Sequence, residues 1–431
     1  MARRCMGGEV KSMRVLVVAI GAFMIAAACG RMPAGPAPNG DYKLYEAAST
    51  SSSQNLSVID SRSHSVERSL PLGAPSPSWT HLYTVTGDTL ADVDPRTGAT
   101  LHTLALRGSY QLPPATMSGV PGGLSQDGRW LVLESFDTTS TIPSATHLLL
   151  IDTSYAKAPQ RVDLKGFFNF DAVSNDGQRI FVIQYVSTTE YFVRRFDVPA
   201  GQLDPNVIFD KSDGSTAMGG LRLSEVPSSD GQWLYSVYVR QDRSAFIHAL
   251  ALDDTGIAFC IDLPGSGYAA NVNEFHWSLA LSADGSHLYA ANGATGIIAD
   301  VNLNRNAPPS VSRTAHIAGG SASSGSFAQD VQAKEFGAGG AALSPDGKTL
   351  VIAGETGVVW VDTASLKVRD RQLTSWRMWS VAISPDGANL YAVNDAGMIA
   401  EVPMNGARGP TIFGGAAGQP LALLRIAAPG S

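Results

Sequence analysis

The amino-acid sequence predicts an all-β fold built from repeated antiparallel four-stranded units, a β-propeller. The first observation is a phrase of the form Ser-x-Asp-Gly, which recurs six times with its Asp residues 40 to 62 positions apart. The second is that short apolar stretches flank each phrase. The third is that no stretch longer than about ten residues beyond the N-terminal segment has a helical period of apolar residues.

Each Asp-Gly pair predicts a tight hairpin turn, because Asp can accept hydrogen bonds from the turn backbone and Gly adopts a positive φ without steric cost. A strand of small and apolar residues such as 379–383 precedes the turn, and an apolar strand such as 390–393 follows it. We therefore expect the six Asp residues to close hairpins rather than to catalyse. They are Asp127, Asp176, Asp230, Asp284, Asp346 and Asp386.

Two further strands complete each predicted unit. The third strand often ends at an acidic residue, as in 149–152 and 359–362, and a fourth strand such as 99–106 follows it. Repeats of about 40 to 50 residues with several strands each are typical of propeller blades. One such sheet cannot bury both of its faces alone, so blades must pack side by side around an axis.

The number of blades depends on how the chain ends are read. Segments 56–60 and 66–72 look like third and fourth strands without a first strand, and 419–426 looks like a first strand without the others. Together these ends would complete one blade and leave no free sheet edge. The segment 76–83 looks like a further unit that has lost its Asp-Gly. Merging this unit with its neighbour gives seven blades, which is our prediction, and counting it separately gives eight, the close alternative.

The N-terminus predicts export. Arg14 precedes an apolar run from 15 to 28, which is too short to cross a bilayer and suits a signal peptide. The run ends in Ala-Ala-Ala-Cys29-Gly, which resembles a bacterial lipobox, although Ala26 stands where that pattern usually has Leu. We expect 1–28 to be a signal peptide, Cys29 to be lipidated and 29–42 to be a Pro/Gly-rich tether. The propeller domain would then be 43–431; ordinary cleavage and secretion is the alternative.

Composition narrows the function classes. Residues 1–28 hold four basic residues and one acidic residue, so their removal takes the formal charge from −7 to about −10. Such an acidic chain is a poor candidate for nucleic-acid binding. Cys260 is the only cysteine beyond Cys29, in an apolar stretch where a small buried side chain is expected rather than a nucleophile. No metal-binding spacing is present, and we expect neither a metal nor another cofactor.

The phrase Ser-Pro-Asp-Gly-x-x-Leu-Tyr, with a later Val-x-Asp-x-x-Thr/Ser, resembles the repeats of bacterial YVTN and lactonase-like β-propellers. The resemblance covers most of 43–427, but its motifs specify blade architecture rather than activity. It implies a relationship to a group that includes sugar lactonases and many cell-surface proteins without known catalysis. WD40 repeats are less similar, because the Gly-His and Trp-Asp dipeptides are missing at the expected places.

Candidate binding residues lie in the connections from the fourth strand of one blade to the first strand of the next. In propellers these connections surround one mouth of the central channel, and in this sequence they map to 109–118, 212–220, 266–277, 319–336 and 374–379. Three of them bring acidic, basic and aromatic side chains to one face; the candidates are Glu274, His276, Glu335, Trp376 and Arg377. The alternative is that His276 is a hydrogen-bonded structural residue, while the neighbouring Trp277 and Trp379 pack between blades.

These observations favour a non-enzymatic, monomeric, membrane-tethered propeller that faces the extracytoplasmic space and binds an envelope protein or a small polar ligand. No Gly-x-Ser-x-Gly marks a nucleophile, and no spacing nominates a pair of catalytic carboxylates. A lactonase-like hydrolase acting at the channel mouth is the alternative. A quinone-cofactor dehydrogenase is a third hypothesis, since 93–98 is similar to quinoprotein propellers but lacks the Trp expected after Gly98.

Overall fold

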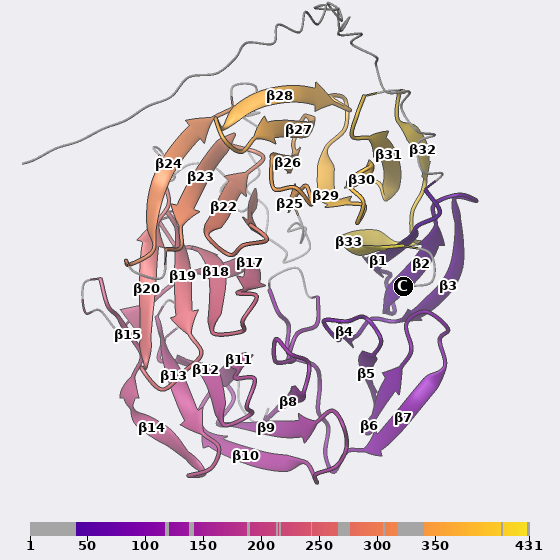
Figure 1. Cartoon of the computed structure of the whole chain (residues 1–431). Helices are drawn as coiled ribbons and strands as arrows, with labels where there is room; N and C mark the ends of the chain where they lie inside the picture. Colours follow the sequence, from indigo (N-terminus) through magenta and orange to yellow (C-terminus); the bar gives the residue numbers. More distant parts are fainter. Residues whose placement is uncertain are drawn as a thin grey trace, which may run out of the picture. The chain divides into compact units, whose positions relative to one another are not determined.

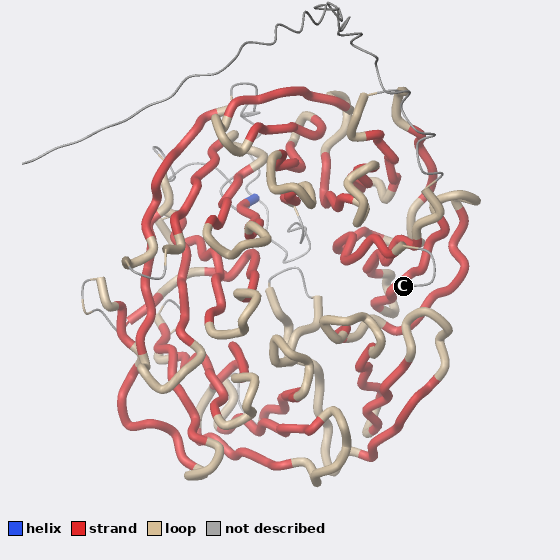
Figure 2. The backbone as a smooth tube through the Cα atoms, in the orientation of Figure 1, coloured by secondary structure: helices blue, strands red, loops and turns tan. Residues whose placement is uncertain are grey.

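The computed structural model describes residues 40–428 except 117–119, 138–141, 188–189, 213, 215–216, 243, 266–275, 305–306, 318–339 and 407. The described residues form 33 β-strands, arranged as eight sheets around a common centre (Figure 1). They contain no α-helix, and Figure 2 shows strands joined by short loops, so the all-β prediction is confirmed. Within this part of the chain, no helix has the length and apolar character needed to span a membrane. Cys29 lies outside the described residues.

Each sheet is one blade of the propeller. From the centre outwards, blade 1 contains β33 (Gln419–Ala427), β1 (Lys43–Ser49), β2 (Gln54–Asp60) and β3 (Ser65–Pro71). In the same order, blade 2 contains β4 (Ala74–Pro75), β5 (Leu82–Thr86), β6 (Thr89–Val93) and β7 (Thr100–Ala105). Blade 3 contains β8 (Trp130–Phe136), β9 (Ala145–Asp152) and β10 (Gln160–Lys165), with isolated bridges such as Leu124 to Leu131 in place of an innermost strand.

The next two blades carry short additional strands. Blade 4 contains β11 (Phe168–Val173), β12 (Arg179–Tyr185), β13 (Tyr191–Asp197) and β14 (Gln202–Val207), and β16 (Ala217–Met218) also pairs with β13. Blade 5 contains β17 (Leu221–Pro227), β18 (Trp233–Val239), β19 (Ala245–Ala251) and β20 (Ile257–Asp262). β15 (Phe209–Asp210) adds a parallel strand at the outer edge of blade 5.

The last three blades are regular antiparallel sheets of four strands. Blade 6 contains β21 (Trp277–Leu281), β22 (His287–Asn292), β23 (Ile297–Asn302) and β24 (Ser310–His316). Blade 7 contains β25 (Ala341–Leu343), β26 (Thr349–Gly354), β27 (Gly357–Asp362) and β28 (Lys367–Gln372). Blade 8 contains β29 (Met378–Ile383), β30 (Asn389–Asn394), β31 (Met398–Pro403) and β32 (Thr411–Gly414).

The seven-blade prediction is therefore wrong, and the alternative of eight blades is correct. The difference lies in blade 2, whose first turn lacks Asp-Gly but keeps the same backbone hydrogen bonds. Ser76 N donates to His81 O at 2.8 Å, and Trp79 N donates to Ser76 O at 2.8 Å. Trp79 takes the position of the turn glycine, with φ 56°. The turn thus forms without the residue pair by which it would be recognised in a sequence.

The first and last described strands lie in the same sheet. β1 pairs antiparallel with β33, from Lys43 opposite Ala427 to Ser49 opposite Gln419. Figure 1 shows them side by side in blade 1. The expectation that the C-terminal segment supplies the first strand of an N-terminal blade agrees with this pairing.

The six Asp-Gly turns share one set of contacts. In each, the Ser hydroxyl donates to Oδ1 of the Asp two residues later at 2.6 to 2.7 Å. The same oxygen accepts the backbone N–H two residues beyond the Asp. The turn glycines have φ between 66° and 74°. These Asp side chains therefore close the hairpins, as the sequence predicts.

Buried apolar clusters between neighbouring blades form the core. One cluster joins blade 5 to blade 6 through residues such as Ile247 and Val301, and all seven residues of β19 are buried. Antiparallel order places the turns between first and second strands, and between third and fourth strands, on one face of the propeller, the turn face. The remaining connections lie on the opposite face, the crossover face.

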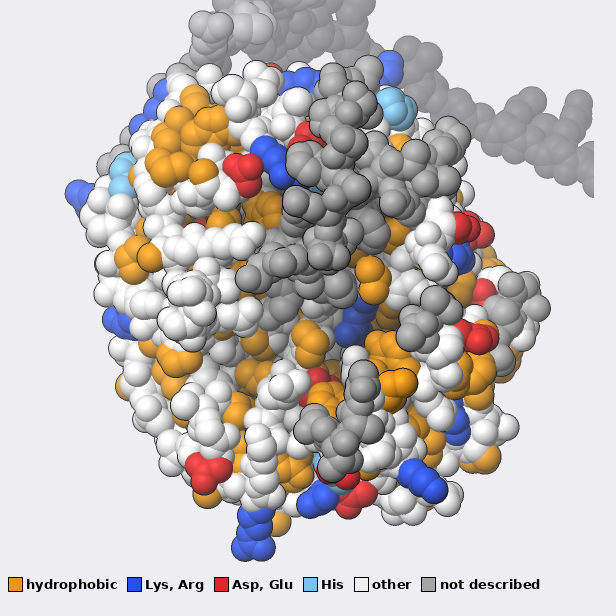
Figure 3. All heavy atoms as spheres, turned by 180° about the vertical axis from the view of Figure 1, so that it is seen from behind, with side chains coloured by type: hydrophobic (Ala, Val, Ile, Leu, Met, Phe, Trp, Pro, Cys, Tyr) orange, Lys and Arg blue, Asp and Glu red, His pale blue; other side chains and the backbone are white. Residues whose placement is uncertain are grey.

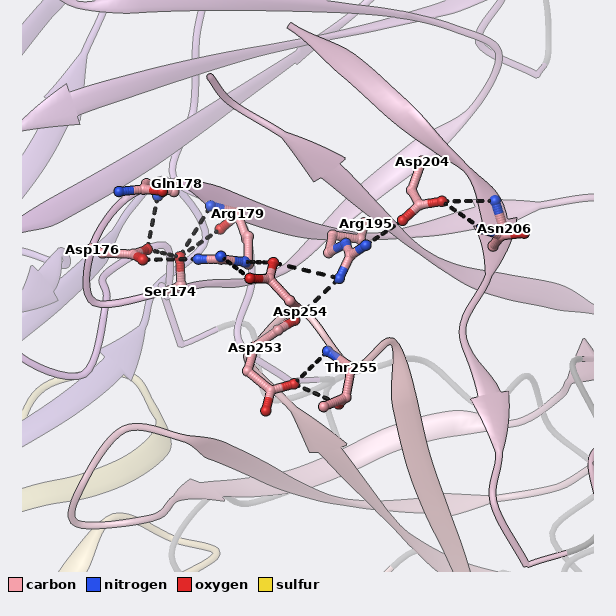
Figure 4. Close-up of polar contacts among 10 residues, drawn as sticks. All are labelled: Ser174, Asp176, Gln178, Arg179, Arg195, Asp204, Asn206, Asp253, Asp254 and Thr255. Atoms are coloured by element: carbon pink, nitrogen blue, oxygen red, sulfur yellow. Dashed lines mark hydrogen bonds and ion pairs between the residues drawn. The ribbon is translucent and has the colours of Figure 1, made fainter. Parts of the chain in front are cut away.

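Ion pairs on the turn face join blade 4 to blade 5 (Figure 4). Arg179 at the start of β12 pairs with Asp176 in its own turn, with 2.8 Å between Nη1 and Oδ2. It also pairs with Asp254 in the turn between β19 and β20. Arg195 pairs with Asp204 and lies 3.8 Å from Asp254. One aspartate of blade 5 thus contacts two arginines of blade 4.

Candidate functional site

The structure brings two of the predicted site residues to a third residue that was not predicted. His276 precedes β21, Arg377 precedes β29, and Glu355 lies in the turn between β26 and β27. His276 Nε2 is 3.5 Å from Glu355 Oε1, and Arg377 Nε is 3.1 Å from the same carboxylate. The predicted Glu274 and Glu335 lie outside the described residues. Blades 6, 7 and 8 therefore meet at one carboxylate on the crossover face.

The contact among His276, Glu355 and Arg377 resembles a structural contact between blades. Burial lowers the pKa of His276, Arg377 lowers it further, and the Glu355 charge opposes both. Trp376 accepts the backbone N–H of Gly357 and packs against a core cluster, so it holds the connection to blade 8. Trp379 donates its ring N–H to Leu421 O at 3.1 Å, which supports the alternative in which this tryptophan packs between blades.

A different set of charged residues lines a cavity of about 490 Å³ among blades 1 to 5. The wall is mostly apolar, with residues such as Phe170, Leu234 and Leu424. Its charged members come from two innermost strands, Asp171 from β11 and Arg222 and Glu225 from β17. Cavities of a few hundred Å³ with an apolar lining and few convergent polar groups are the usual form of small-molecule sites.

Both innermost strands carry a β-bulge at these residues. In blade 4, Phe170 pairs with Val182 and Ala172 with Phe181, so Asp171 is the extra residue. In blade 5, the register shifts between Arg222 and Ser224. A bulge redirects a side chain that regular alternation would point elsewhere.

One guanidinium serves two carboxylates in this cluster. Arg222 Nη1 donates to Asp171 Oδ1 at 2.6 Å and lies 3.3 Å from Glu225 Oε2. Among the described residues, Asp171 Oδ2 and Glu225 Oε2 have no hydrogen-bond partner. The side chain of Asp171 is 2 % exposed and that of Glu225 is 22 % exposed, so Glu225 is the more open to the cavity.

Burial controls the protonation of this cluster. It raises the pKa of Glu225 to about 7, where Arg222 opposes the shift and Asp171 adds to it. Burial also raises the pKa of Asp171, against the effect of Arg222. The carboxylates outweigh burial at Arg222 and raise its pKa, so the guanidinium stays charged. Burial therefore favours the protonated form of both carboxyl groups, and the charged Arg222 opposes this in each case.

Sequence reasoning missed Asp171, Arg222 and Glu225. A signal was present, because 168–173 and 221–227 are largely apolar first strands interrupted by charged residues. Charged side chains are rarely fully buried unless they are paired. A charged residue inside a predicted first strand therefore identifies a candidate for the channel wall.

No protein-family model matches the chain, and no curated protein matches it. Similar solved structures include apo AztD from Citrobacter koseri, with 12 % identity, 88 % of this chain and 96 % of that chain covered, and a TM-score of 0.52. The dihydro-heme d1 dehydrogenase NirN in complex with DHE has 13 % identity, 90 % and 76 % coverage, and a TM-score of 0.52. The periplasmic gluconolactonase PpgL of Pseudomonas aeruginosa has 18 % identity, 90 % and 99 % coverage, and a TM-score of 0.44.

Together, the eight radial sheets and the likeness to the structures of AztD and NirN define the fold of the protein, which is a β-propeller. This propeller has eight blades and carries a cluster of Asp171, Arg222 and Glu225 in a cavity among its innermost strands.

Proposed function

We propose that this protein is an extracytoplasmic binding propeller that holds a small polar ligand in the cavity lined by Asp171, Arg222 and Glu225. The observation that carries the proposal is that two carboxylates share one guanidinium without full pairing. Asp171 Oδ2 has no described hydrogen-bond partner, and Glu225 Oε2 faces Arg222 at 3.3 Å without a hydrogen bond. Leaving a buried acceptor unsatisfied costs about 1–3 kcal/mol, and more for a charged group. A ligand with hydrogen-bond donors would remove that cost.

Thermal-shift measurements test the cavity. The mature chain is screened against panels of amines, sugars and hydroxy acids, together with Asp171→Asn and Glu225→Gln. Asp254→Asn is the matched control, because it also removes a carboxylate but lies on the turn face between blades 4 and 5 (Figure 4). The proposal is supported if a compound raises the Tm of the wild type and of the control variant but not the Tm of either cavity variant. If no compound stabilises the wild type, or the cavity variants respond like the wild type, the cavity is not the binding site.

The proposal includes the membrane anchor. In it, residues 1–28 are a signal peptide, Cys29 carries the lipid, and 29–42 joins the membrane to a monomeric propeller of the YVTN and lactonase-like type. The support is the apolar run ending at Ala-Ala-Ala-Cys29. Intact mass and membrane fractionation, with and without Cys29→Ala, test it. A lipid-sized mass increment and release of the variant from membranes are expected; an unmodified soluble wild type contradicts the anchor.

An anchored propeller could also serve as an interaction scaffold for an envelope protein. Figure 3 shows one face of the molecule, on which hydrophobic side chains lie singly and in small groups among charged side chains of both signs. Such mixed surfaces are ordinary for transient protein partners. Crosslinking in membranes followed by mass spectrometry tests this role, with a known envelope complex as the positive control. If the known complex is trapped while the propeller is recovered alone, the scaffold role is contradicted.

Hydrolysis of a small sugar-derived lactone is the second candidate function. The position of Glu225 on the cavity wall favours it, because burial raises the pKa of this carboxyl group to about 7 and a general base works best when its pKa lies near the working pH. Glu225 would take a proton from water as that water attacks the lactone carbonyl. It would return this proton to the ring oxygen as the ring C–O bond breaks, which gives a hydroxy acid. Hydrolysis of glucono-δ-lactone, followed with a pH indicator, tests this. A rate equal to that of buffer, or one unchanged in Glu225→Gln, contradicts it.

A further inference from the structure

The cavity has one aromatic wall residue in an unusual backbone conformation. Trp79 lies in the turn between β4 and β5 and lines the same cavity as Asp171 and Glu225. Six other blades place Gly at the equivalent position, with φ between 66° and 74°, whereas Trp79 has φ 56°. A bulky residue in the left-handed region is strained, and such strain is concentrated at ligand clamps.

Neighbouring side chains hold the Trp79 ring in place. The Tyr45 ring lies against it with 4.9 Å between centroids, and the Arg425 guanidinium carbon is 5.4 Å from the ring centroid. Trp79 stays partly exposed. A fixed indole on a cavity wall offers an apolar face that also attracts cations through its ring electrons.

The charge of the lining specifies the other end of a ligand. Asp171 and Glu225 face one guanidinium, and Arg222 is the only Lys or Arg among the described residues that line the cavity. An ammonium group brings three N–H donors and the missing positive charge. A carboxylate ligand would bring further acceptors, and no donor, to two carboxyl groups that already have oxygens without a described hydrogen-bond partner.

We propose that the cavity takes an organic cation, a small amine whose ammonium group pairs with Asp171 and Glu225 while its apolar body lies against Trp79. This inference rests on the proposed function, because it names the ligand class of the same cavity. The carboxylates favour a positively charged ligand, and Trp79 supplies the apolar contact for the body of that ligand.

Three probes of nearly equal shape separate these contributions. Tryptamine carries an ammonium, tryptophol a hydroxyl and indole-3-acetate a carboxylate on the same ring system. Isothermal titration at pH 8 with the mature chain measures their affinities. We expect tryptamine to bind at least tenfold more tightly than tryptophol, and indole-3-acetate not to bind.

Variants assign the contacts to residues. Glu225→Gln and Asp171→Asn are expected to weaken tryptamine at least tenfold and to leave tryptophol within about twofold. Trp79→Gly is expected to weaken both probes, and it should fold because Gly occupies this position in six other turns. Trp233→Leu is the control, since Trp233 lies in a separate groove between blades 5 and 6.

The outcomes separate this inference from the proposal on which it rests. Equal or tighter binding of tryptophol or indole-3-acetate, or tryptamine binding that Glu225→Gln leaves unchanged, overturns the cation specificity. If no indole probe binds, while a sugar or hydroxy acid stabilises the wild type and not Asp171→Asn, the inference fails and the proposed function stands. If no compound of any panel binds in the cavity, both fail.

Discussion

Replacing Glu225 by Gln should flatten the decline in stability that the wild-type protein shows between about pH 4.5 and pH 7. An ordinary Glu loses its proton near pH 4.5, whereas burial raises the pKa of Glu225 in the folded protein to about 7. The folded state therefore binds more protons than the unfolded state in this window. Because stability falls with rising pH wherever the folded state binds more protons, the free energy of unfolding declines across it.

The magnitude follows from the size of the shift. One pKa unit corresponds to 1.36 kcal/mol, so raising the Glu225 pKa from 4.5 to about 7 costs about 3 kcal/mol once the group is fully ionised. Glu225→Gln cannot ionise, so it should exceed the wild type by up to that amount at pH 8 and match it near pH 4.5. The charged groups facing Glu225 are Asp171 and Arg222, and both remain in the variant.

Urea unfolding at pH 4.5, 6 and 8, followed by tryptophan fluorescence, measures the effect. Glu46→Gln is a matched comparison, because burial in blade 1 raises the pKa of Glu46 to about 7 as well. The two residues lie in different blades, so their effects should add. If Glu225→Gln is less stable than the wild type by the same amount at every pH, Glu225 stabilises the fold as a paired carboxylate, and the argument from burial is refuted.

Three further predictions concern the contacts around this cluster and between blades. Arg222→Met should lower the free energy of unfolding by about 3–5 kcal/mol at pH 8 and by less at pH 5, because it leaves two carboxylates without a cation; an equal loss at both pH values in urea titrations contradicts this. Arg179→Ala should cost at most about 1 kcal/mol and lose its effect in high salt, as expected for ion pairs whose carboxylates are exposed, and a Tm difference that persists in 1 M NaCl contradicts it. Asp386→Ala should destabilise more than Asp346→Ala, because Asp386 also accepts a 2.5 Å hydrogen bond from Tyr42, as scanning calorimetry would show; equal losses would contradict a role for this contact between blades 8 and 1.

The repeat architecture was predictable because its determinants are local. Each Ser-x-Asp-Gly phrase specifies its own hairpin through contacts that span five residues, so the phrase alone identifies the turn. The blade count was not predictable in the same way. Ser76 supplies the hydroxyl of the turn, but Trp79 stands where Gly is expected. A count of blades based on the turn glycine therefore misses any blade in which another residue takes the position of that glycine.

The candidate site, like the fold, was predictable from the sequence only in part. His276 and Arg377 were predicted to share a face, and their common contact with Glu355 places them together. Glu355 was missed because only connections between blades were searched. Turns between second and third strands lie on that same crossover face, since both kinds of connection follow an even number of strands.

The cluster of Asp171, Arg222 and Glu225 could not be identified without the tertiary structure, because other innermost strands also carry polar side chains that join blades. Ser224 accepts the backbone N–H of Leu279, and Ser380 accepts that of Leu423, so each joins its blade to the next. A polar residue in a first strand is therefore explained by packing in these cases. Asp171 also joins its blade to the next, through Arg222 of blade 5, but it is a charged residue at a bulge and leaves one carboxylate oxygen without a described partner. The pairing with Arg222 accounts for one oxygen of Asp171, whereas a buried carboxylate oxygen without a donor adds cost without a structural return. This imbalance is the physical reason to assign the cavity to a ligand.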